Sequence, residues 1–378
     1  MRILHTADWH LGKTLKGQDR TPEVHEALKE LLGLVSSERV ELVLVSGDLF
    51  DRSVVSSAAE AAAFEFFVGL KEKGIPALVI AGNHDSRERL EALAPLLALT
   101  GTRAYGNLRF AQEGGVVEVG GLRVALLPFL SERRLVKAQQ LLQQDTGGWR
   151  QTYAEGMRQL IAHLTAPGVH LLMAHLTVEG AQLGGGEFTF HTTNSYAVLK
   201  GHLPPTLGYV ALGHIHKQQK VSDGPVAWYP GSLIQLDFGE GEGAPRGALL
   251  VELEPGKPAR VHEIPGRWGK PLKTFRLRLE DLDRRWEELR EFPGYTKLVL
   301  EGQGNPALRK RLFEEVPRLL DVEFQAPSRE GPSPPASPER LSWSEAYAQY
   351  RRETAGEASL DELLKAFQEV LEEVLAPR

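Results

Sequence analysis

Short apolar runs alternate with amphipathic segments along the first two thirds of the chain. The runs predict strands over residues 2–6, 42–46, 77–80, 122–127, 170–174, 209–212 and 226–229. They are rich in Val, Leu and Ile and mostly lack regular polar alternation, which is typical of strands covered on both faces. Helical spacing appears between several of them, for example over 22–35 and 58–73. Later runs at 247–252 and 260–264 follow without helices, so we expect a mixed α/β sandwich rather than a purely parallel sheet.

Two breaks divide the remainder of the chain. Gly and Pro cluster in PGRWGKP, and Pro and Ser dominate SREGPSPPASPER. Between the breaks, an alternating strand followed by further helices and strands predicts a small α/β domain. We expect a first domain over 1–268, a second over 269–327, a linker over 328–340 and helices over 341–378. The last helix carries a wide apolar stripe, which either a partner or the chain's own domain must cover.

Polar side chains follow five of the apolar runs, at the point where each run ends. They are Asp8 and His10, Asp48 and Asp51, the series Asn83, His84 and Asp85, then His175, and finally His214 and His216. One such ending is compatible with an ordinary turn, since Gly, Asn and Asp are turn residues. Five endings of this kind indicate instead the carboxyl edge of an α/β sheet, where ligands bind.

The donor types in this set favour a transition metal. Carboxylate, amide oxygen and imidazole suit manganese, iron(II) or zinc, and the set is too rich in nitrogen for calcium or magnesium alone. Seven candidate ligands are too many for one ion and fit two: Asp8, His10, Asp48, Asn83, His175, His214 and His216. Asp48 lies at the centre of their order and is the natural bridge. A pair of such ions favours the hydrolysis of phosphoesters.

Composition narrows the protein class further. The chain has 378 residues and no Cys, which excludes disulfides and thiolate metal sites. No apolar run approaches the roughly 20 residues that span a bilayer, and the N-terminus lacks a secretory pattern, so we expect no membrane and a cytoplasmic location. The net charge of -6 lowers the expectation of a DNA partner. It does not exclude one, because a local basic surface or a bound cation can outweigh it.

The motifs and their order resemble the calcineurin-like metallophosphoesterase superfamily. They are D-x-H at Asp8, G-D-x-x-D at Gly47, G-N-H-D at Gly82, the single His175, and G-H-x-H at Gly213. Within that superfamily, HTADWHLGKTL, SGDLFD, IAGNHDS, GHIHKQQ and YPGSLIQLDFGE are similar to the SbcD-type nuclease branch. The resemblance covers essentially the whole chain. It implies a four-layer α/β/β/α sandwich with a small α/β capping domain and C-terminal helices.

The resemblance also implies roles for individual residues. One ion would be held by Asp8, His10, Asp48 and His216, and the other by Asp48, Asn83, His175 and His214. His84 would face the scissile phosphate, and Asp51 would orient His84. Some members of the branch carry His at the position of Asp51, so a structural turn role for Asp51 stays open. Asp85 follows the motif and is as well suited to fixing the loop.

The function implied by the resemblance is a manganese-dependent DNA nuclease. It would degrade double-stranded ends and cut single strands or hairpins in DNA repair. Its partner would be an SbcC-type ATPase that grips the C-terminal helices, and the chain would form a homodimer. One rival is a phosphatase or phosphodiesterase acting on a smaller phosphoester, which would not need the extra domain and helices. The other is a scaffold without activity, which the filled ligand positions argue against.

Several other residues near the motifs have two possible roles. Lys13, Lys16 and Arg20 follow the first ligand pair, where they can contact a DNA backbone or lie on a solvated loop. His5 lies inside the first predicted strand, and we expect it to be a core histidine. The apolar helical stretches over 58–70 and 90–99 are either a dimer interface or core.

Overall fold

The computed structural model describes residues 1–131, 134–138, 153–185, 187 and 197–326. Contacts divide the chain into two units, Met1–Ala326 and Pro327–Arg378. The second unit lies outside the described residues. The linker expected over 328–340 and the helices expected over 341–378 therefore lie outside them as well.

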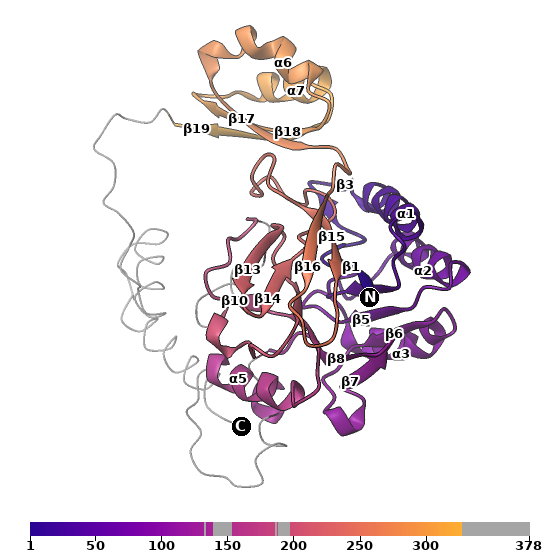
Figure 1. Cartoon of the computed structure of the whole chain (residues 1–378). Helices are drawn as coiled ribbons and strands as arrows, with labels where there is room; N and C mark the ends of the chain where they lie inside the picture. The colour runs from indigo at the N-terminus through magenta and orange to yellow at the C-terminus, as the bar shows by residue number, and fades with distance from the viewer. Residues whose placement is uncertain (132–133, 139–152, 186, 188–196, 327–378) are drawn as a thin grey trace, which may run out of the picture. The chain divides into compact units, whose positions relative to one another are not determined.

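The first sheet has six strands in the order β16-β15-β1-β4-β5-β6 (Figure 1). They are β1 (Arg2–Thr6), β4 (Leu42–Val45), β5 (Ala77–Ile80), β6 (Thr102–Tyr105), β15 (Gly247–Glu252) and β16 (Arg260–Pro265). Strands β1, β4, β5 and β6 run parallel to one another. At one edge of the sheet, β15 is antiparallel to β1, and β16 is antiparallel to β15. The crossovers between the parallel strands contain α1 (Thr21–Ser37), α2 (Ser57–Glu72) and α3 (Arg87–Ala98).

The second sheet also has six strands, in the order β13-β14-β12-β9-β8-β7. They are β7 (Val116–Val119), β8 (Leu122–Leu127), β9 (Leu171–His175), β12 (Tyr209–Gly213), β13 (Gln219–Asp223) and β14 (Val226–Tyr229). The four central strands are parallel, and both edge strands are antiparallel to their neighbours. Helix α5 (Tyr153–Leu164) precedes β9 and packs its apolar face against this sheet.

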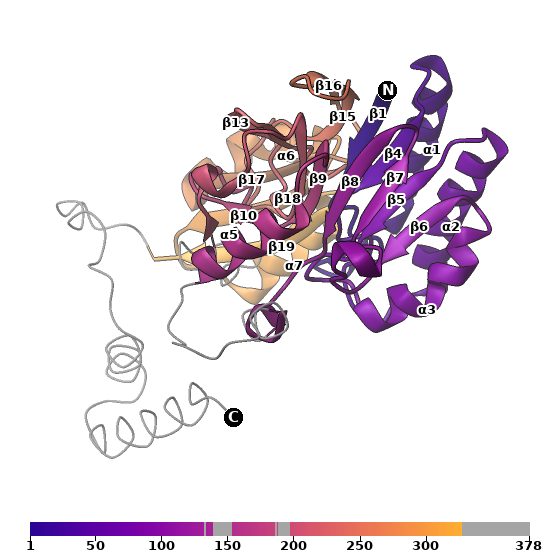
Figure 2. The same cartoon turned by 60° about the horizontal axis from the view of Figure 1, so that its bottom comes forward.

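The two sheets pack face to face, and helices cover their outer faces. In β4, Leu42 and Leu44 join an apolar cluster with Met173 of β9, while Val43 and Val45 belong to the cluster that contains α1 and α2. Both faces of the strand are thus buried, which is why the run shows no polar alternation. Figure 2 shows α1, α2 and α3 on one side of the paired sheets and α5 on the other. The expected four-layer α/β/β/α sandwich is confirmed.

Capping residues set where two of these helices begin. The side chain of Ser56 accepts a hydrogen bond from the main-chain nitrogen of Ala59 at the start of α2. Ser86 does the same for Arg89 at the start of α3, directly after the Gly-Asn-His-Asp turn. Such caps satisfy main-chain donors that a helix start leaves unbonded. The cap at Ser86 therefore ends the polar turn after β5 within a few residues of the strand.

Residues 272–325 form a third, smaller sheet with two helices (Figure 1). Its parallel strands lie in the order β17-β18-β19, and its apolar cluster includes Phe275, Leu298 and Leu312. The elements are β17 (Leu272–Arg278), η5 (Leu279–Asp281), η6 (Asp283–Arg285), α6 (Trp286–Glu291), β18 (Tyr295–Glu301), α7 (Pro306–Glu315) and β19 (Leu319–Gln325). Shorter elements elsewhere are β2 (Thr14–Leu15), β3 (Gln18–Asp19), η1 (Ala111–Glu113), β10 (Thr177–Val178), β11 (Ala197–Val198) and η4 (Lys200–His202).

Among the helices of the described ranges, none combines the length and hydropathy needed to cross a bilayer.

Candidate metal centre

The candidate site lies where the carboxyl ends of two neighbouring groups of strands meet. Strands β1, β4 and β5 are adjacent in the first sheet, and β9 and β12 are adjacent in the second. Main-chain and side-chain bonds join the loops beyond them: the nitrogen of Asp8 donates to the oxygen of Gly47 at 3.0 Å, and the nitrogen of His214 donates to the Asp8 carboxylate at 3.0 Å. Residues far apart in the sequence therefore converge on one buried edge.

Four candidate ligands occupy the left-handed region of backbone conformation. Their φ values are +52° for Asp8, +47° for His10, +53° for Asp48 and +105° for His214. This region is uncommon for residues other than Gly, and it costs free energy that the surrounding structure must offset. Such strain gathers at functional sites, so its presence at four positions beyond the carboxyl ends of the two sheets indicates a site built to hold side chains in fixed directions.

Two motif glycines are required by close packing. A Cβ atom on Gly82 would lie 2.0 Å from Oδ1 of Asp48, and one on Gly47 would lie 2.3 Å from Nδ1 of His175. Gly47 also has a φ of +96°. Only a residue without a side chain allows Asp48 and His175 to approach these turns, because real Cβ contacts of this length do not occur.

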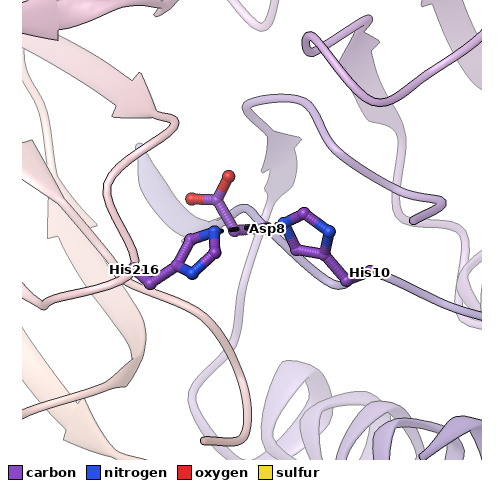
Figure 3. A group of neighbouring side chains, drawn as sticks. All are labelled: Asp8, His10 and His216. Atoms are coloured by element: carbon purple, nitrogen blue, oxygen red, sulfur yellow. Dashed lines mark hydrogen bonds between the residues drawn. The ribbon is translucent and has the colours of Figure 1, made fainter. Parts of the chain in front are cut away.

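The first group of donors consists of Asp8, His10 and His216 (Figure 3). Nδ1 of His10 lies 3.2 Å from the Asp51 carboxylate, and Nδ1 of His216 lies 2.9 Å from the Glu240 carboxylate. Since these carboxylates accept hydrogen bonds, each Nδ1 carries a hydrogen, and in the neutral ring each Nε2 then carries the lone pair. The two Nε2 atoms face each other at 3.1 Å. Converging lone pairs beside a carboxylate are suited to a shared cation.

The second group consists of Asp48, His175 and His214. Oδ1 of Asn83 lies 3.0 Å from Nε2 of His175 and 2.8 Å from Nδ1 of His214, so the amide oxygen belongs to the same group. The Nδ1 hydrogen of His175 is donated to the main-chain oxygen of Ser46 at 2.7 Å. The opposite ring nitrogen of His175 is thereby directed into the group.

Asp48 lies between the two groups. Its Oδ2 atom is 3.4 Å from Nε2 of His175 and 3.7 Å from Nε2 of His10. One carboxylate within reach of donors from both groups is the arrangement that allows two metal ions to share a ligand. All seven predicted ligands are brought together, and their chemistry fits a dinuclear site for divalent ions.

Opposing pKa shifts mark this buried edge. Burial raises the pKa of Asp8 to about 7, although His175 and His216 act against the shift. Burial also opposes ionisation of Asp48, but the neighbouring His175 outweighs it and holds the pKa of Asp48 well below its ordinary value. The pKa of His175 rises to about 9 despite its burial, because the Asp48 carboxylate lies beside it. Strongly coupled, perturbed groups of this kind are characteristic of functional sites.

His84 and Asp51 contact each other, but not through the Asp51 side chain. Nδ1 of His84 donates to the main-chain oxygen of Asp51 at 2.9 Å, and the main-chain nitrogen of His84 donates to Asp48 Oδ1 at 2.8 Å. The Asp51 carboxylate instead lies 3.2 Å from both Nδ1 of His10 and Nζ of Lys13. The Asp51 carboxylate therefore contacts the candidate ligand His10 rather than the ring of His84.

The sequence leaves the role of one residue near the site open and does not indicate another. Asp85 accepts hydrogen bonds from the main-chain nitrogens of Gly82 at 2.9 Å and Phe50 at 3.0 Å, which fixes the loop. Glu240, only 1% exposed, is not identified by the sequence patterns. It lies in a loop after β14 rather than at a strand end, and its place in the YPGSLIQLDFGE segment is the one signal that could have found it.

The basic residues near the site and His5 all contact other parts of the protein. Lys16 pairs with Asp321 at 2.9 Å, and Lys13 pairs with Asp51. Arg20 is fully buried, so both expectations for it, a DNA contact and a solvated loop, are wrong. His5 is a core histidine as expected: it is buried, and its ring contacts Tyr209 and Ser46.

Comparisons with known proteins place the chain in a family. The family model for calcineurin-like phosphoesterases matches residues 1–218. The SbcD subunit of the SbcCD nuclease of Bacillus subtilis is 32% identical over 73% of this chain and 72% of its own length. The SbcD subunit from Rhodobacter capsulatus is 30% identical over 73% and 71%. A dimetal phosphatase from Danio rerio is 12% identical, with a TM-score of 0.40, and the match covers 69% of this chain and 98% of that one.

The family match spans more than half of the chain, and the relatives match across most of their own length. The matched range 1–218 contains all of the strand-end residues that the fold gathers around Asp48. The chain therefore belongs to the calcineurin-like phosphoesterase family, as a metal-dependent phosphodiesterase of the SbcD type.

Proposed function

We propose that this protein is a manganese-dependent DNA nuclease. It would degrade double-stranded ends, cut single strands and hairpins, and act in the processing and repair of DNA ends. The observation that carries the proposal is the pair of donor groups joined by Asp48, in a chain that resembles curated SbcCD nuclease subunits. Phosphodiester hydrolysis is the reaction that two adjacent divalent ions favour.

The ligand assignment within the site is part of the proposal. Each ion would be held by four residues, with one carboxylate common to both sets. The first position would use Asp8, His10, Asp48 and His216, and the second would use Asp48, Asn83, His175 and His214. Support comes from the contacts that link each set and from the burial of the carboxylates and rings.

The chain's own residues would position and protonate the substrate. The ring of His84 is only partly buried, and its Nδ1 hydrogen bond to the Asp51 main-chain oxygen leaves Nε2 for the phosphodiester. His84 would stabilise charge on the phosphate or give a proton to the departing 3′ oxygen. The buried side chains of the two sheets around the site would limit the access of water to it. Bound ions would supply neutralisation of the phosphate charge and activation of the attacking water.

Manganese is proposed because the donor set admits it and the resemblance to the SbcD-type nuclease branch implies it. Three kinds of ligand are combined: carboxylate, amide oxygen and neutral imidazole. Oxygen donors suit manganese, and imidazole binds it more readily than it binds calcium or magnesium.

The assembly of the protein is also a proposal. Residues 269–327 would cap the site, residues 328–340 would be a linker, and residues 341–378 would bind an SbcC-type ATPase. Two copies of the chain would form a homodimer that presents two sites to one DNA, in the cytoplasm. The support for the ATPase partner is the similarity to proteins named as the SbcD component of SbcCD nucleases.

A digestion experiment tests the proposed function. The purified chain is given end-labelled duplex, a DNA hairpin and an aryl phosphodiester, each with manganese, magnesium or a chelator. We expect cleavage of both DNA substrates with manganese, weaker cleavage with magnesium and none with chelator. Hydrolysis of the aryl compound without cleavage of DNA would instead support a phosphodiesterase for a smaller substrate.

A further inference from the structure

Glu240 is a buried carboxylate that contacts the ring of a proposed metal ligand. Its Oε1 atom lies 2.9 Å from Nδ1 of His216. Its Oε2 atom accepts hydrogen bonds from the main-chain nitrogen of Leu236 and from Nη1 of Arg246, both at 3.0 Å. Both oxygens are therefore used, and the carboxylate is fixed from two sides. Burying a charged group is costly unless it is paired and hydrogen-bonded, and Glu240, at 1% exposure, meets this condition through Arg246, Leu236 and His216.

The consequence for His216 concerns the position of its hydrogen. A carboxylate has no hydrogen to donate, so Glu240 requires the hydrogen of His216 to be on Nδ1. Nε2 then presents its lone pair toward His10 and Asp8 (Figure 3). A carboxylate behind a ligand histidine also makes the ring a stronger electron donor.

The same arrangement recurs at His10 but not at His175. The Asp51 carboxylate lies 3.2 Å from Nδ1 of His10. At His175, the partner of Nδ1 is the neutral main-chain oxygen of Ser46. Both histidines of the Asp8 group are thus backed by carboxylates, whereas His175 in the Asn83 group is backed by an uncharged oxygen.

We propose that Glu240 is a positioning residue for metal binding, which together with Asp51 makes the Asp8, His10 and His216 position the tighter of the two. This inference rests on the two-ion assignment in the proposed function. It predicts that the two ions bind in sequence rather than together. It also predicts that Glu240 affects one binding step and leaves the other nearly unchanged.

Calorimetric titration of the full chain with manganese, without DNA, tests the inference in the variant Glu240→Gln. A glutamine has one accepting oxygen, so it cannot satisfy His216 and the Leu236 and Arg246 donors together. We expect the tighter dissociation constant to rise by about 10- to 100-fold, as for other residues behind metal ligands. The weaker constant should change by less than about threefold, and the electron paramagnetic resonance spectrum of the first bound manganese should change.

Two further variants serve as control and second test. Glu91→Gln changes a carboxylate that holds the main-chain nitrogens of Gly106 and Asn107 and the guanidinium of Arg109, and it should leave both constants unchanged. Asp51→Asn acts on His10 of the same position and should weaken the same step. If Glu240→Gln does not fold, the manganese titration of Asp51→Asn tests the inference in its place.

Three results would overturn the inference. They are unchanged constants in folded Glu240→Gln, an equal loss at both steps, and a loss confined to the weaker step. Because no DNA is present, failure of the inference is distinct from failure of the proposed nuclease activity. A wild-type chain that binds two ions unequally but cuts no DNA would refute only the proposed nuclease activity.

Discussion

At the scale of single residues, the site depends on side chains held in directions that the backbone would not adopt without support. Asp8, His10 and Asp48 all have positive φ, and each is tied into the adjoining loops by main-chain bonds, such as the one from the His10 nitrogen to the Asp48 oxygen at 3.0 Å. This cost in conformational free energy is offset by the packing of two complete sheets behind the loops.

A substitution at His84 should separate the effects on catalysis and on metal binding. In His84→Gln we expect cleavage to fall by about 10²- to 10⁴-fold, since the proposed charge stabilisation and proton transfer are lost. Both ions should stay bound, because His84 is outside the proposed ligand sets. Single-turnover cleavage and metal content of the same preparation measure the two effects. Loss of an ion would show that His84 is itself a ligand, and retained cleavage would remove the proposed role.

Two glycines make a matched pair of substitutions. In Gly82→Ala the new Cβ would meet Oδ1 of Asp48 at 2.0 Å, so we expect weakened metal binding and a stability loss of about 1–3 kcal/mol. In Gly33→Ala, on α1, the Cβ meets nothing within 4 Å, and the helix should gain about 0.5–1 kcal/mol. Chemical denaturation and manganese titration measure both. Normal manganese binding by Gly82→Ala would contradict the packing argument.

At the scale of elements, the central strands of the two large sheets are buried on both faces. Leu44 of β4 lies in the cluster between the two sheets and is fully buried. We expect Leu44→Ala to lower the free energy of unfolding by about 2–5 kcal/mol. The control Val54→Ala, at a side chain that is 86% exposed, should change it by less than about 0.5 kcal/mol. Equal effects in chemical denaturation would contradict the inter-sheet core.

The central strands could be predicted from the sequence because burial on both faces leaves a continuous apolar signature. The runs at 2–6, 77–80, 122–127 and 226–229 coincide with β1, β5, β8 and β14. Strand β13 has no such signature and is missed. It reads QKVSD, lies at a sheet edge and pairs with one neighbour only, so its side chains need not be apolar.

The candidate ligands could be found in the sequence for a related reason. Each follows a strand whose end is visible in the sequence, and parallel strands bring their ends to one edge. Glu240 and Ser46 show what this reasoning misses. Glu240 reaches His216 from a loop, and Ser46 contributes a main-chain oxygen, so only the folded structure brings them to the rings.

At the scale of the described molecule, Arg20 joins the segment after the first ligand pair to distant parts of the chain. Its guanidinium donates to the main-chain oxygen of Gln235 at 3.0 Å and of Lys270 at 3.3 Å, and it pairs with Glu23 at 2.8 Å. The adjacent Lys16 pairs with Asp321 of β19. Lys16 thus links the site segment to the third sheet, and the buried Arg20 links the same segment to Gln235 and to Lys270, which lies just before β17.

Burial should decide how much each link contributes. We expect Arg20→Ala to cost about 3–5 kcal/mol, because it leaves the largely buried Glu23 carboxylate without its cationic partner. Asp321→Asn should cost less than about 1 kcal/mol, since the Lys16 side chain is 51% exposed. Thermal unfolding compares the two variants. A larger loss in Asp321→Asn than in Arg20→Ala would show that the exposed link dominates.

The metal content of Asp48→Asn tests directly whether one carboxylate joins two ion positions. Wild-type chain dialysed against manganese should retain two ions, and Asp48→Asn should lose affinity for both, because Oδ2 lies within 3.7 Å of donors from each group. The control Asp223→Asn, at a side chain that is 91% exposed, should retain two. Two ions retained by Asp48→Asn, or a wild-type chain that holds fewer than two, would contradict the shared dinuclear centre.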